Sequence, residues 1–376
     1  MRGLRERRAV RRGARVAVAS VVVALAVAAG LVAVLGGGGG REGRDVDRAR
    51  PEAGRTPAPQ PPPSSSPAPS FSPSAVRATP SPTPTRRQRQ AARPYLHPGS
   101  QVLDWVRANP GDGRRAVIES RIASRPAAVW FAEYAPEAIT SQVSEVTSGA
   151  AAEGRVPVLV PYAIPDRDCG GASEGGAPDL DAYAGWIDRF AAGLGHGEVV
   201  VILEPDSIAQ TDCLSEEQRA DRLAVLAHAG RVLKAANPRT RIYYDAGHSG
   251  WHAPARQAAL LKQAGAASAA SAGIFSNVSN FRWTADEIAY DRQVLDALGG
   301  PADLGAVIDT SRNGNGPPAD GQWCDPDGRR IGRAPTLDTG EARIHAYLWV
   351  KLPGESDGCK GAPGTFSPSY AYELAR

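Results

Sequence analysis

Two segments of this chain, Val199-Val-Val-Ile-Leu-Glu-Pro-Asp-Ser207 and Arg241-Ile-Tyr-Tyr-Asp-Ala-Gly-His248, decide the fold. Each segment begins with a short apolar, β-branched run and ends in acidic and small residues. Apolar runs of this length are typical of strands buried on both faces, as in a parallel sheet covered by helices. The polar residues that follow would then lie at the carboxyl ends of those strands.

The same pattern recurs through the C-terminal part of the 376-residue chain. Apolar residues at helical spacing predict helices at Leu180–Leu194 and Glu216–Ala236, and the alanine-rich stretch Pro254–Ala270 is compatible with a third. About seven strand–helix units favour a closed or nearly closed parallel α/β barrel over an open sheet. Further strands are predicted at Ala127–Phe131, Val156–Tyr162, Gly273–Val278, Leu304–Ile308 and Ala346–Val350.

Acidic residues follow five of the seven predicted strands, which chance would rarely produce. In a parallel barrel the strand ends converge on one face, where active sites are built. We therefore predict a functional site on this face. The polar residues at the strand ends are Asp166–Asp168, Glu204–Ser207, Asp245–His248, Asn277, Asn280, Asp309–Asn313, Lys351, Glu355 and Asp357.

Carbohydrate is the substrate that suits such a rim. Sugar rings have apolar faces that stack on aromatic side chains, and Trp130, Trp251 and Trp323 lie near the same strand ends. Cleavage of a glycosidic bond needs one carboxylic acid to protonate the leaving oxygen. A second carboxylate must assist water or attack the sugar directly.

Other chemistries find little support in the residues. The four cysteines of an exported domain predict two disulfides, with three pairings open, and leave no thiol for catalysis. The sequence has no G-x-S-x-G motif and no closely spaced metal ligands, so we predict no serine hydrolase, no metal and no cofactor. It also lacks a basic run with interleaved aromatics, so nucleic acid is not an expected partner.

The N-terminus has a different composition from the rest. Residues 1–15 contain seven arginines and one glutamate, and residues 16–36 carry no charge. A helix of that length would span about 31 Å, enough to cross a bilayer, and the basic flank would stay in the cytoplasm. We favour an uncleaved signal anchor, lying in the membrane, over a cleaved signal peptide. Residues 37–93 are predicted to be a disordered Pro/Ser-rich linker, and residues 94–376 a catalytic domain outside the cytoplasm.

Five motifs along the chain resemble those of glycoside hydrolase family 6. That family comprises endoglucanases and cellobiohydrolases, which hydrolyse cellulose with inversion on a distorted seven-stranded α/β barrel. The resemblance runs in order from about residue 127 to the C-terminus, and it implies this fold and this activity. The motifs are Tyr162-Ala-Ile-Pro-Asp-Arg-Asp-Cys169, Ile202-Leu-Glu-Pro-Asp-Ser207, Asp245-Ala-Gly-His-Ser-Gly-Trp251, Asp309-Thr-Ser-Arg-Asn-Gly314 and Lys351-Leu-Pro-Gly-Glu-Ser-Asp-Gly358.

The resemblance also implies roles for individual residues. Asp206 would be the general acid, Asp168 would raise the pKa of that acid and help to position water, and Asp357 is a candidate base. Arg167 and Arg312 would keep Asp168 ionised. The residues expected to contact the substrate or the attacking water are Tyr162, Ser173, Trp130, His248, Trp251, Asn280, Trp323, Lys351 and Glu355, with Asp245 supporting the Trp251 site.

Structural roles are the alternative for several of these residues. Arg167 and Asp168 would then form an ion pair, and Asp245 or Asp309 would cap the segment that follows it. The remaining tryptophans are expected in the core rather than in the site. They are Trp105, Trp186 and Trp349.

The cysteines and one short loop refine the expectation. The resemblance selects the disulfides Cys169–Cys213 and Cys324–Cys359 from the three possible pairings. Cys359 follows Asp357 by only two residues, so a loop that roofs the cleft in cellobiohydrolases is absent here. Pro254 also replaces a distant tryptophan of those enzymes. An open cleft and an endo-β-1,4-glucanase (EC 3.2.1.4) are therefore expected, with cellulose or soluble β-glucan as substrate and a monomer as the working form.

Three other functions stay open at this point. One is the exo action of a cellobiohydrolase. The second is a surface protein that binds carbohydrate without cleaving it, although such a protein would not need both Asp206 and Asp168. The third is an enzyme that remodels a wall or capsule glycan with the same acids.

Overall fold

The computed structural model describes residues 92–376. The predicted basic flank (1–15), apolar segment (16–36) and nearly all of the linker (37–93) lie outside the described residues. The chain joins the barrel at Arg93, whose carbonyl accepts a hydrogen bond from the Val156 amide, while Tyr95 donates to the Val156 carbonyl. Among residues 92–376, no helix combines the length and the apolar composition that crossing a bilayer requires.

Seven parallel strands form one sheet in which each strand pairs with the next along the chain. All seven predicted strands are present, with ends that differ by one to two residues for most of them. This confirms the predicted fold class. The strands are β1 Val129–Phe131, β2 Val158–Pro161, β3 Val199–Leu203, β4 Thr240–Asp245, β5 Gly273–Ser276, β6 Gly305–Asp309 and β7 Ile344–Leu348.

The sheet curls into a barrel that is nearly closed. Within the described residues, no strand ladder joins β7 to β1. Two hydrogen bonds cross this seam instead: the Ala128 amide donates to the Trp349 carbonyl at 2.9 Å, and the Trp130 indole nitrogen donates to the Val350 carbonyl at 2.8 Å. The seam is therefore bridged by one backbone hydrogen bond and one side-chain hydrogen bond rather than by a strand ladder.

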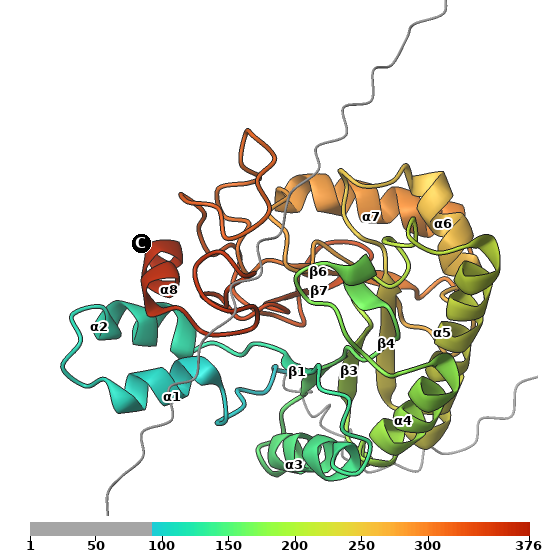
Figure 1. Cartoon of the computed structure of the whole chain (residues 1–376), viewed down its shortest axis with the longest axis horizontal. Helices are drawn as coiled ribbons and strands as arrows, with labels where there is room; N and C mark the ends of the chain where they lie inside the picture. The colour runs from blue at the N-terminus through green and yellow to red at the C-terminus, as the bar shows by residue number, and fades with distance from the viewer. Residues whose placement is uncertain (1–91) are drawn as a thin grey trace, which may run out of the picture. The chain divides into compact units, whose positions relative to one another are not determined.

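Helices cover the outside of the curled sheet. In Figure 1, α3 to α7 follow one another around it, and α1, α2 and α8 gather beside the seam. Helix α5 matches its predicted range because Ser215 and Gln218 form a capping box at its start. The α-helices are α1 Gln101–Ala108, α2 Arg115–Ile118, α3 Ile139–Ala152, α4 Leu180–Ala192, α5 Glu216–Ala236, α6 Pro254–Gln263, α7 Thr284–Leu298 and α8 Pro368–Ala375.

Alternate residues of each strand face two separate apolar layers. The residues Val160, Ile202 and Phe275 pack inside the barrel, whereas their neighbours Leu159 and Val201 pack against the helices. A third cluster joins α1, α2 and α8 to the chain that follows β7. Such two-sided burial is what the continuous apolar strands predicted.

The expected core tryptophans divide into two groups. Trp186 and Trp349 are buried, as predicted. Trp105 is only half-buried and packs against Phe366 and the Arg114 guanidinium, so its assignment to the core is wrong in part.

Candidate active site

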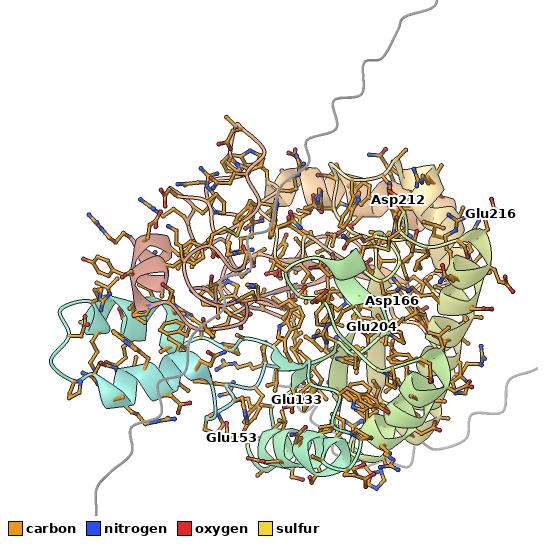
Figure 2. The ribbon with its side chains drawn as sticks, in the orientation of Figure 1. Glu133, Glu153, Asp166, Glu204, Asp212 and Glu216 are labelled. Carbon is orange, nitrogen blue, oxygen red and sulfur yellow. A yellow bond between two sulfur atoms is a disulfide. The ribbon has the colours of Figure 1, made fainter. Side chains whose placement is uncertain are left out.

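The chain leaves β3 through a strained turn that carries two carboxyls. Glu204 and Asp206 both have left-handed backbone conformations, with φ of 48° and 68°. The buried Glu204 carboxylate accepts hydrogen bonds from the amides of Ala163 and Ile164 at 3.0 and 3.1 Å. Burial raises the pKa of Glu204 to about 7, against the lowering effect of these amides. In Figure 2, Glu204 lies near the middle of the barrel, whereas Asp212 lies at its periphery.

Asp206 lies among other carboxyls at the same strand ends. Burial raises the pKa of Asp206 well above its usual range, and the negative charges of Asp245 and Asp168 raise it further. Lys351 acts in the opposite direction but does not reverse the shift. The side chain is therefore a carboxylic acid that keeps its proton where an ordinary aspartate would have lost it.

Asp245 supports the Asp206 turn from below. Its carboxylate is fully buried and accepts hydrogen bonds from the amides of Ile208 and Ala209 at 3.1 and 2.8 Å, and from Gly247 at 2.8 Å. It thus joins the loop after β3 to the loop after β4, which carries His248. The sequence left a cap on the following segment as an alternative role; the Gly247 amide lies in that segment, whereas Ile208 and Ala209 lie on the loop after β3.

Asp168 lies on the loop after β2 and is held by one serine. Its Oδ2 atom accepts hydrogen bonds from the Ser173 amide at 2.8 Å and from the Ser173 hydroxyl at 2.9 Å. The Tyr162 hydroxyl lies 3.0 Å from the same serine oxygen. A Cβ atom at position 171 would lie 2.5 Å from Oδ2, so Gly171 leaves the space that the carboxylate occupies.

Neither predicted arginine partner contacts Asp168, so that expectation is wrong. The Arg167 guanidinium donates to the backbone carbonyls of Ala132, Tyr162 and Ser173 and lies 4.6 Å from the centre of the Tyr162 ring. The three carbonyls lie after β1, after β2 and on the Ser173 loop, and they accept from the Nε and Nη1 atoms of Arg167. Arg167 therefore fixes the Tyr162 side of the site rather than the charge of Asp168.

Arg312 belongs to a second cluster, at the ends of β6 and β7. It is fully buried and pairs with Asp357 at 2.7 Å, and Lys351 approaches the other oxygen of Asp357 at 2.9 Å. Although burial alone would raise the pKa of Asp357, the two cations lower it to about 2. Asp357 is therefore an ionised carboxylate under all ordinary conditions.

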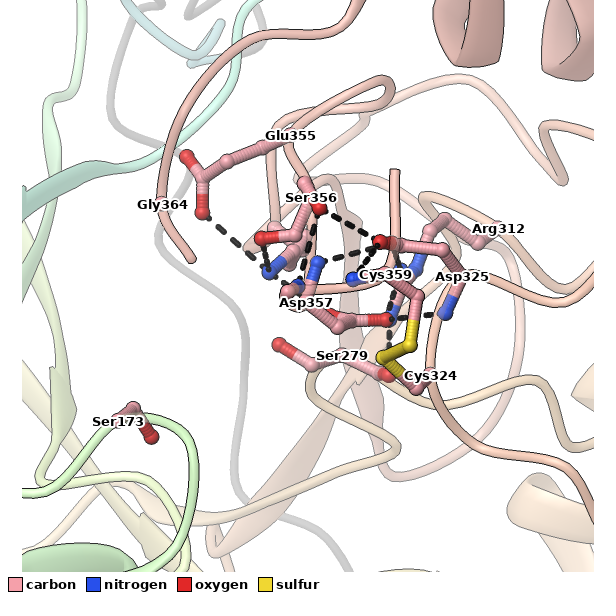
Figure 3. Close-up of polar contacts among 12 residues, drawn as sticks. Ser173, Ser279, Arg312, Cys324, Asp325, Glu355, Ser356, Asp357, Cys359 and Gly364 are labelled. Atoms are coloured by element: carbon pink, nitrogen blue, oxygen red, sulfur yellow. Dashed lines mark hydrogen bonds and ion pairs between the residues drawn. A yellow bond between two sulfur atoms is a disulfide. The ribbon is translucent and has the colours of Figure 1, made fainter. Parts of the chain in front are cut away.

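Asp325 organises this cluster and was not recognised in the sequence. Its buried carboxylate accepts hydrogen bonds from the Ser356 hydroxyl at 2.6 Å and from three amides of the following loop, Asp357, Cys359 and Lys360. Figure 3 shows Asp325 and Asp357 beside Arg312 and the Cys324–Cys359 disulfide, while Ser173 stands apart on its own loop. In the sequence, the only sign of this role was that Asp325 directly follows Cys324.

Lys351 and Glu355, both expected to contact sugar, lie next to this cluster. The Lys351 ammonium group is 3.4 Å from the Glu355 carboxylate, and 9% of the Lys351 side chain is exposed. Burial raises the pKa of Glu355, and Lys351 offsets part of that rise. Both side chains are held in place before any substrate arrives, which favours a binding role.

The expected aromatic contacts occupy three places. Trp130 packs edge-on against Tyr162, with 5.2 Å between ring centres. His248 and Trp251 lie together, 5.3 Å apart, and burial lowers the pKa of His248 to about 4, which keeps it neutral. Trp323 is 61% exposed. A second exposed tryptophan, Trp283 at 48%, lies at the start of α7 and was not predicted as a site residue.

Asn280 and the disulfides complete the set of predicted residues. The Asn280 amide side chain donates to the Val278 carbonyl at 3.2 Å, so it faces its own turn. The structure contains both of the disulfides that the resemblance implied, Cys169–Cys213 and Cys324–Cys359. The first joins the loops of Asp168 and Asp206, and the second joins the loops of Trp323 and Asp357.

The described part of the chain holds no group of three or more His, Cys, Asp or Glu side chains arranged to bind a metal ion. The arrangement at the strand ends is instead an acid with a raised pKa near a second carboxylate. On the open face of an α/β barrel, that combination is the one that glycosidic bond hydrolysis requires. Site and fold together define a glycoside hydrolase.

Comparison with known proteins identifies the family. A family model described as "Glycosyl hydrolases family 6" matches residues 86–372, and this chain belongs to that family. The chain is 57% identical over 272 residues to Endoglucanase 1 of Streptomyces sp. (strain KSM-9), covering 72% of this chain and 75% of that protein. It is 48% identical to Endoglucanase A of Thermobispora bispora, covering 75% of this chain and 61% of that protein.

A solved structure extends the comparison to three dimensions. The endoglucanase Cel6 from Mycobacterium tuberculosis, determined in complex with a thio-linked cellobioside, superposes with a TM-score of 0.70 at 38% sequence identity. The match covers 76% of this chain and 97% of that chain. The sequence resemblance to this family is thus confirmed.

Proposed function

We propose that this chain is an endo-β-1,4-glucanase (EC 3.2.1.4) that hydrolyses internal bonds of cellulose or soluble β-glucan with inversion. The observation that carries this proposal is the state of Asp206. Burial and the charges of Asp245 and Asp168 keep its proton in place, as a general acid needs. Asp206 then protonates the glycosidic oxygen as the bond to the leaving sugar breaks.

The loop after β2 carries the residues that we assign to the attacking water. Asp168 has only Ser173 as a hydrogen-bonding partner among the described side chains, and no cation pairs with it. We assign it the task of orienting the water with Ser173 and accepting its proton. Asp357 is the weaker base because Arg312 and Lys351 hold its pKa near 2. Its proposed task is to hold Lys351 in position.

The remaining predicted residues are assigned to substrate binding. Tyr162 is fixed between Trp130, Arg167 and Ser173, and presses on the sugar at the cleavage point. His248 and Trp251 receive the sugar on the leaving side, while Lys351 and Glu355 bind the sugar on the other side. Trp323 offers an exposed ring for stacking, and Asn280 offers an amide.

Endo action is supported by two observations. The relatives at 57% and 48% identity both carry the name endoglucanase. The loop from Asp357 to Cys359 is short and tied down by Asp325, so it cannot roof the cleft. A chain could then enter anywhere along its length.

We propose residues 94–376 as the catalytic domain and place it outside the cytoplasm. Two disulfides in this part of the chain support an oxidising compartment. The membrane anchor at 16–36, the linker and a monomeric state remain predictions from the sequence.

The test compares the purified protein with its Asp206→Asn and Asp212→Asn variants on carboxymethyl cellulose and mixed-linkage β-glucan. Asp212 is an exposed aspartate six residues further along the same loop and serves as the matched control. We expect a rapid fall in viscosity, release of the inverted anomer, and a loss of about 10²- to 10⁴-fold for Asp206→Asn alone. A retained anomer, or equal activity in Asp206→Asn, would contradict the proposal.

A further inference from the structure

A buried arginine on helix α5 contacts the loop after β2, which carries Asp168. Arg222 is only 3% exposed. Its Nη2 atom donates to the Pro165 carbonyl at 2.7 Å and to the Asp166 carbonyl at 3.1 Å. These two residues directly precede Arg167 and Asp168 in the chain. A side chain 57 positions away from Pro165 in the sequence therefore holds the start of this loop.

The position of the Arg222 charge is unfavourable in itself. Burial lowers the pKa of Arg222, and the negative charges of Asp166 and Glu204 offset only part of that effect. A hydrophobic side chain would fill the same space without the cost of removing a charge from water. Packing alone therefore does not explain why a guanidinium lies here, whereas its hydrogen bonds to the loop carbonyls do.

The loop that Arg222 contacts has a strained backbone. Asp166, Asp168 and Cys169 all adopt left-handed conformations, with φ of 52°, 56° and 47°. Residues with a side chain keep such a conformation only where the surrounding structure imposes it. The position of the Asp168 carboxylate therefore depends on the contacts that hold this loop from outside.

The chain between β3 and the middle of α5 supplies those contacts at both ends of the strained segment. At its start, Arg222 binds the two backbone carbonyls. At its end, Cys169 forms a disulfide with Cys213. Asp168 lies between these two attachments and reaches the Ser173 amide and hydroxyl through its Oδ2 atom. Loss of either attachment would free one end of the segment that carries this carboxylate.

We propose that Arg222 is a positioning residue that sets the place of Asp168, and with it that of the attacking water, through the backbone carbonyls of Pro165 and Asp166. The inference rests on the proposed function, in which Asp168 orients that water. Without the two hydrogen bonds from Arg222, the loop relaxes and the Asp168 carboxylate moves. It then serves the water less well and raises the pKa of Asp206 by less.

The experiment compares Arg222→Met, Arg222→Gln and Asp168→Asn, and it combines each Arg222 variant with Asp168→Asn in the full chain. Both Arg222 variants remove the charge while retaining an unbranched side chain. Urea unfolding shows which of them keeps the wild-type transition, and that variant is used for the double-mutant cycle. Arg231→Met, which replaces an exposed arginine of the same helix, is the matched control. The substrates are β-glucan and 2,4-dinitrophenyl cellobioside.

We expect the Arg222 variant to lower kcat on both substrates by the same factor of at least about tenfold, because a displaced water slows both reactions. KM should stay within about twofold. The alkaline limb of kcat/KM should move to lower pH, as in Asp168→Asn. Once Asp168 is replaced, removal of Arg222 should cost no further activity, because no carboxylate is left to position. Arg231→Met should match the wild type.

Two results would overturn the role of Arg222 while leaving the proposed function intact. One is an unchanged kcat and pH profile in the Arg222 variant. The other is a loss of the same size in the wild-type and Asp168→Asn backgrounds, which indicates a general structural effect. If Asp168→Asn itself lost no activity, the proposed task of Asp168 would fall and the inference with it.

Discussion

The two sides of the barrel rim each hold an aspartate, Asp206 and Asp357 respectively, in opposite electrostatic states. At the ends of β3 and β4, the carboxyls of Glu204 and Asp245 accept hydrogen bonds from backbone amides, and burial raises their pKa values and that of Asp206. At the ends of β6 and β7, Arg312 and Lys351 contact Asp357 and lower its pKa to about 2.

Burial therefore does not decide which carboxyl keeps a proton. It acts to raise the pKa of Asp357 as well as that of Asp206, and the direct contacts of Arg312 and Lys351 reverse the result at Asp357. Arg167 lies on the same side as Asp206, but its guanidinium donates to backbone carbonyls rather than to a carboxylate. The difference between the raised pKa of Asp206 and the lowered pKa of Asp357 thus comes from where the cationic side chains point.

The largest expected effect is on catalysis. Variants of Asp206 and Asp357 should differ in how far their loss of activity depends on the leaving group of the substrate. We expect Asp206→Ala to lower kcat on β-glucan by about 10³-fold or more, and by less than about tenfold on 2,4-dinitrophenyl cellobioside, whose leaving group needs no proton. Asp357→Asn should lower both rates by the same factor because it acts through position. Parallel assays on the two substrates measure this. An equal loss for Asp206→Ala on both substrates would remove the acid role.

The second effect is on stability, and here we expect the larger loss on replacing Asp357. Removing Asp357 leaves the buried Arg312 with its nearest charge partner lost, and a broken buried pair typically costs about 3–5 kcal/mol. We therefore expect Asp357→Ala to lower the free energy of unfolding by that amount in urea titrations. Asp327, paired with Lys360 but 90% exposed on the same side, is the control and should change little on replacement by alanine. Equal effects of the two variants would contradict the comparison.

Much of this arrangement could be predicted from the sequence, because it depends on local pattern. The strands are continuous β-branched runs, and the residues after them must lie at one rim in any parallel barrel. Helix α5 was predicted to the residue, since its start carries a capping box. Helix α6 was predicted too long: it ends at Gln263, and Gly265 adopts a left-handed conformation just beyond it.

Long-range partners could not be predicted in the same way. Asp325 acts on residues 31 to 35 positions away, and nothing in its neighbourhood except Cys324 marks it. The assignment of Arg167 and Arg312 to Asp168 failed because sequence spacing does not show where a long, flexible side chain points. Helix α3 was missed because Thr140, Ser141 and Ser144 weaken its helical pattern.

The pH dependence of stability provides a third test. The pKa of Glu204 is raised from 4.5 to about 7, so its contribution to stability is complete below pH 4.5 and is lost as the pH rises through 7. The shift corresponds to about 3 kcal/mol. Between pH 4.5 and 8, the free energy of unfolding should therefore fall by about 3 kcal/mol less in Glu204→Gln than in the wild type. Urea unfolding at several pH values measures this.

Asp357 supplies the opposite case for the same experiment. Its pKa falls from 3.8 to about 2 on folding, so its contribution is present above pH 4 and is lost as the pH drops toward 2. Asp357→Asn should flatten this acidic region and leave the interval from pH 4.5 to 8 unaffected. If Glu204→Gln altered the acidic region instead, the assignment of the two sides would be reversed.

The smallest effect tests whether the acid depends on its neighbour. The charge of Asp168 raises the pKa of Asp206, so Asp168→Asn should lower that pKa and let Asp206 lose its proton at a lower pH. The alkaline limb of kcat/KM should then move down by up to about one pH unit. Residual activity suffices for this measurement, because the position of the limb matters and its height does not.

Asp166→Asn is the matched control for this shift. Asp166 lies two residues away on the same loop, has an exposed side chain, and tolerates asparagine because its backbone is left-handed. It removes the same charge from the loop without removing one that raises the pKa of Asp206. A shift in Asp168→Asn alone would mean that a single neighbouring carboxylate tunes the acid. Equal shifts in both variants would mean that the net charge of the loop does so, and no shift in either would leave burial and Asp245 as the causes.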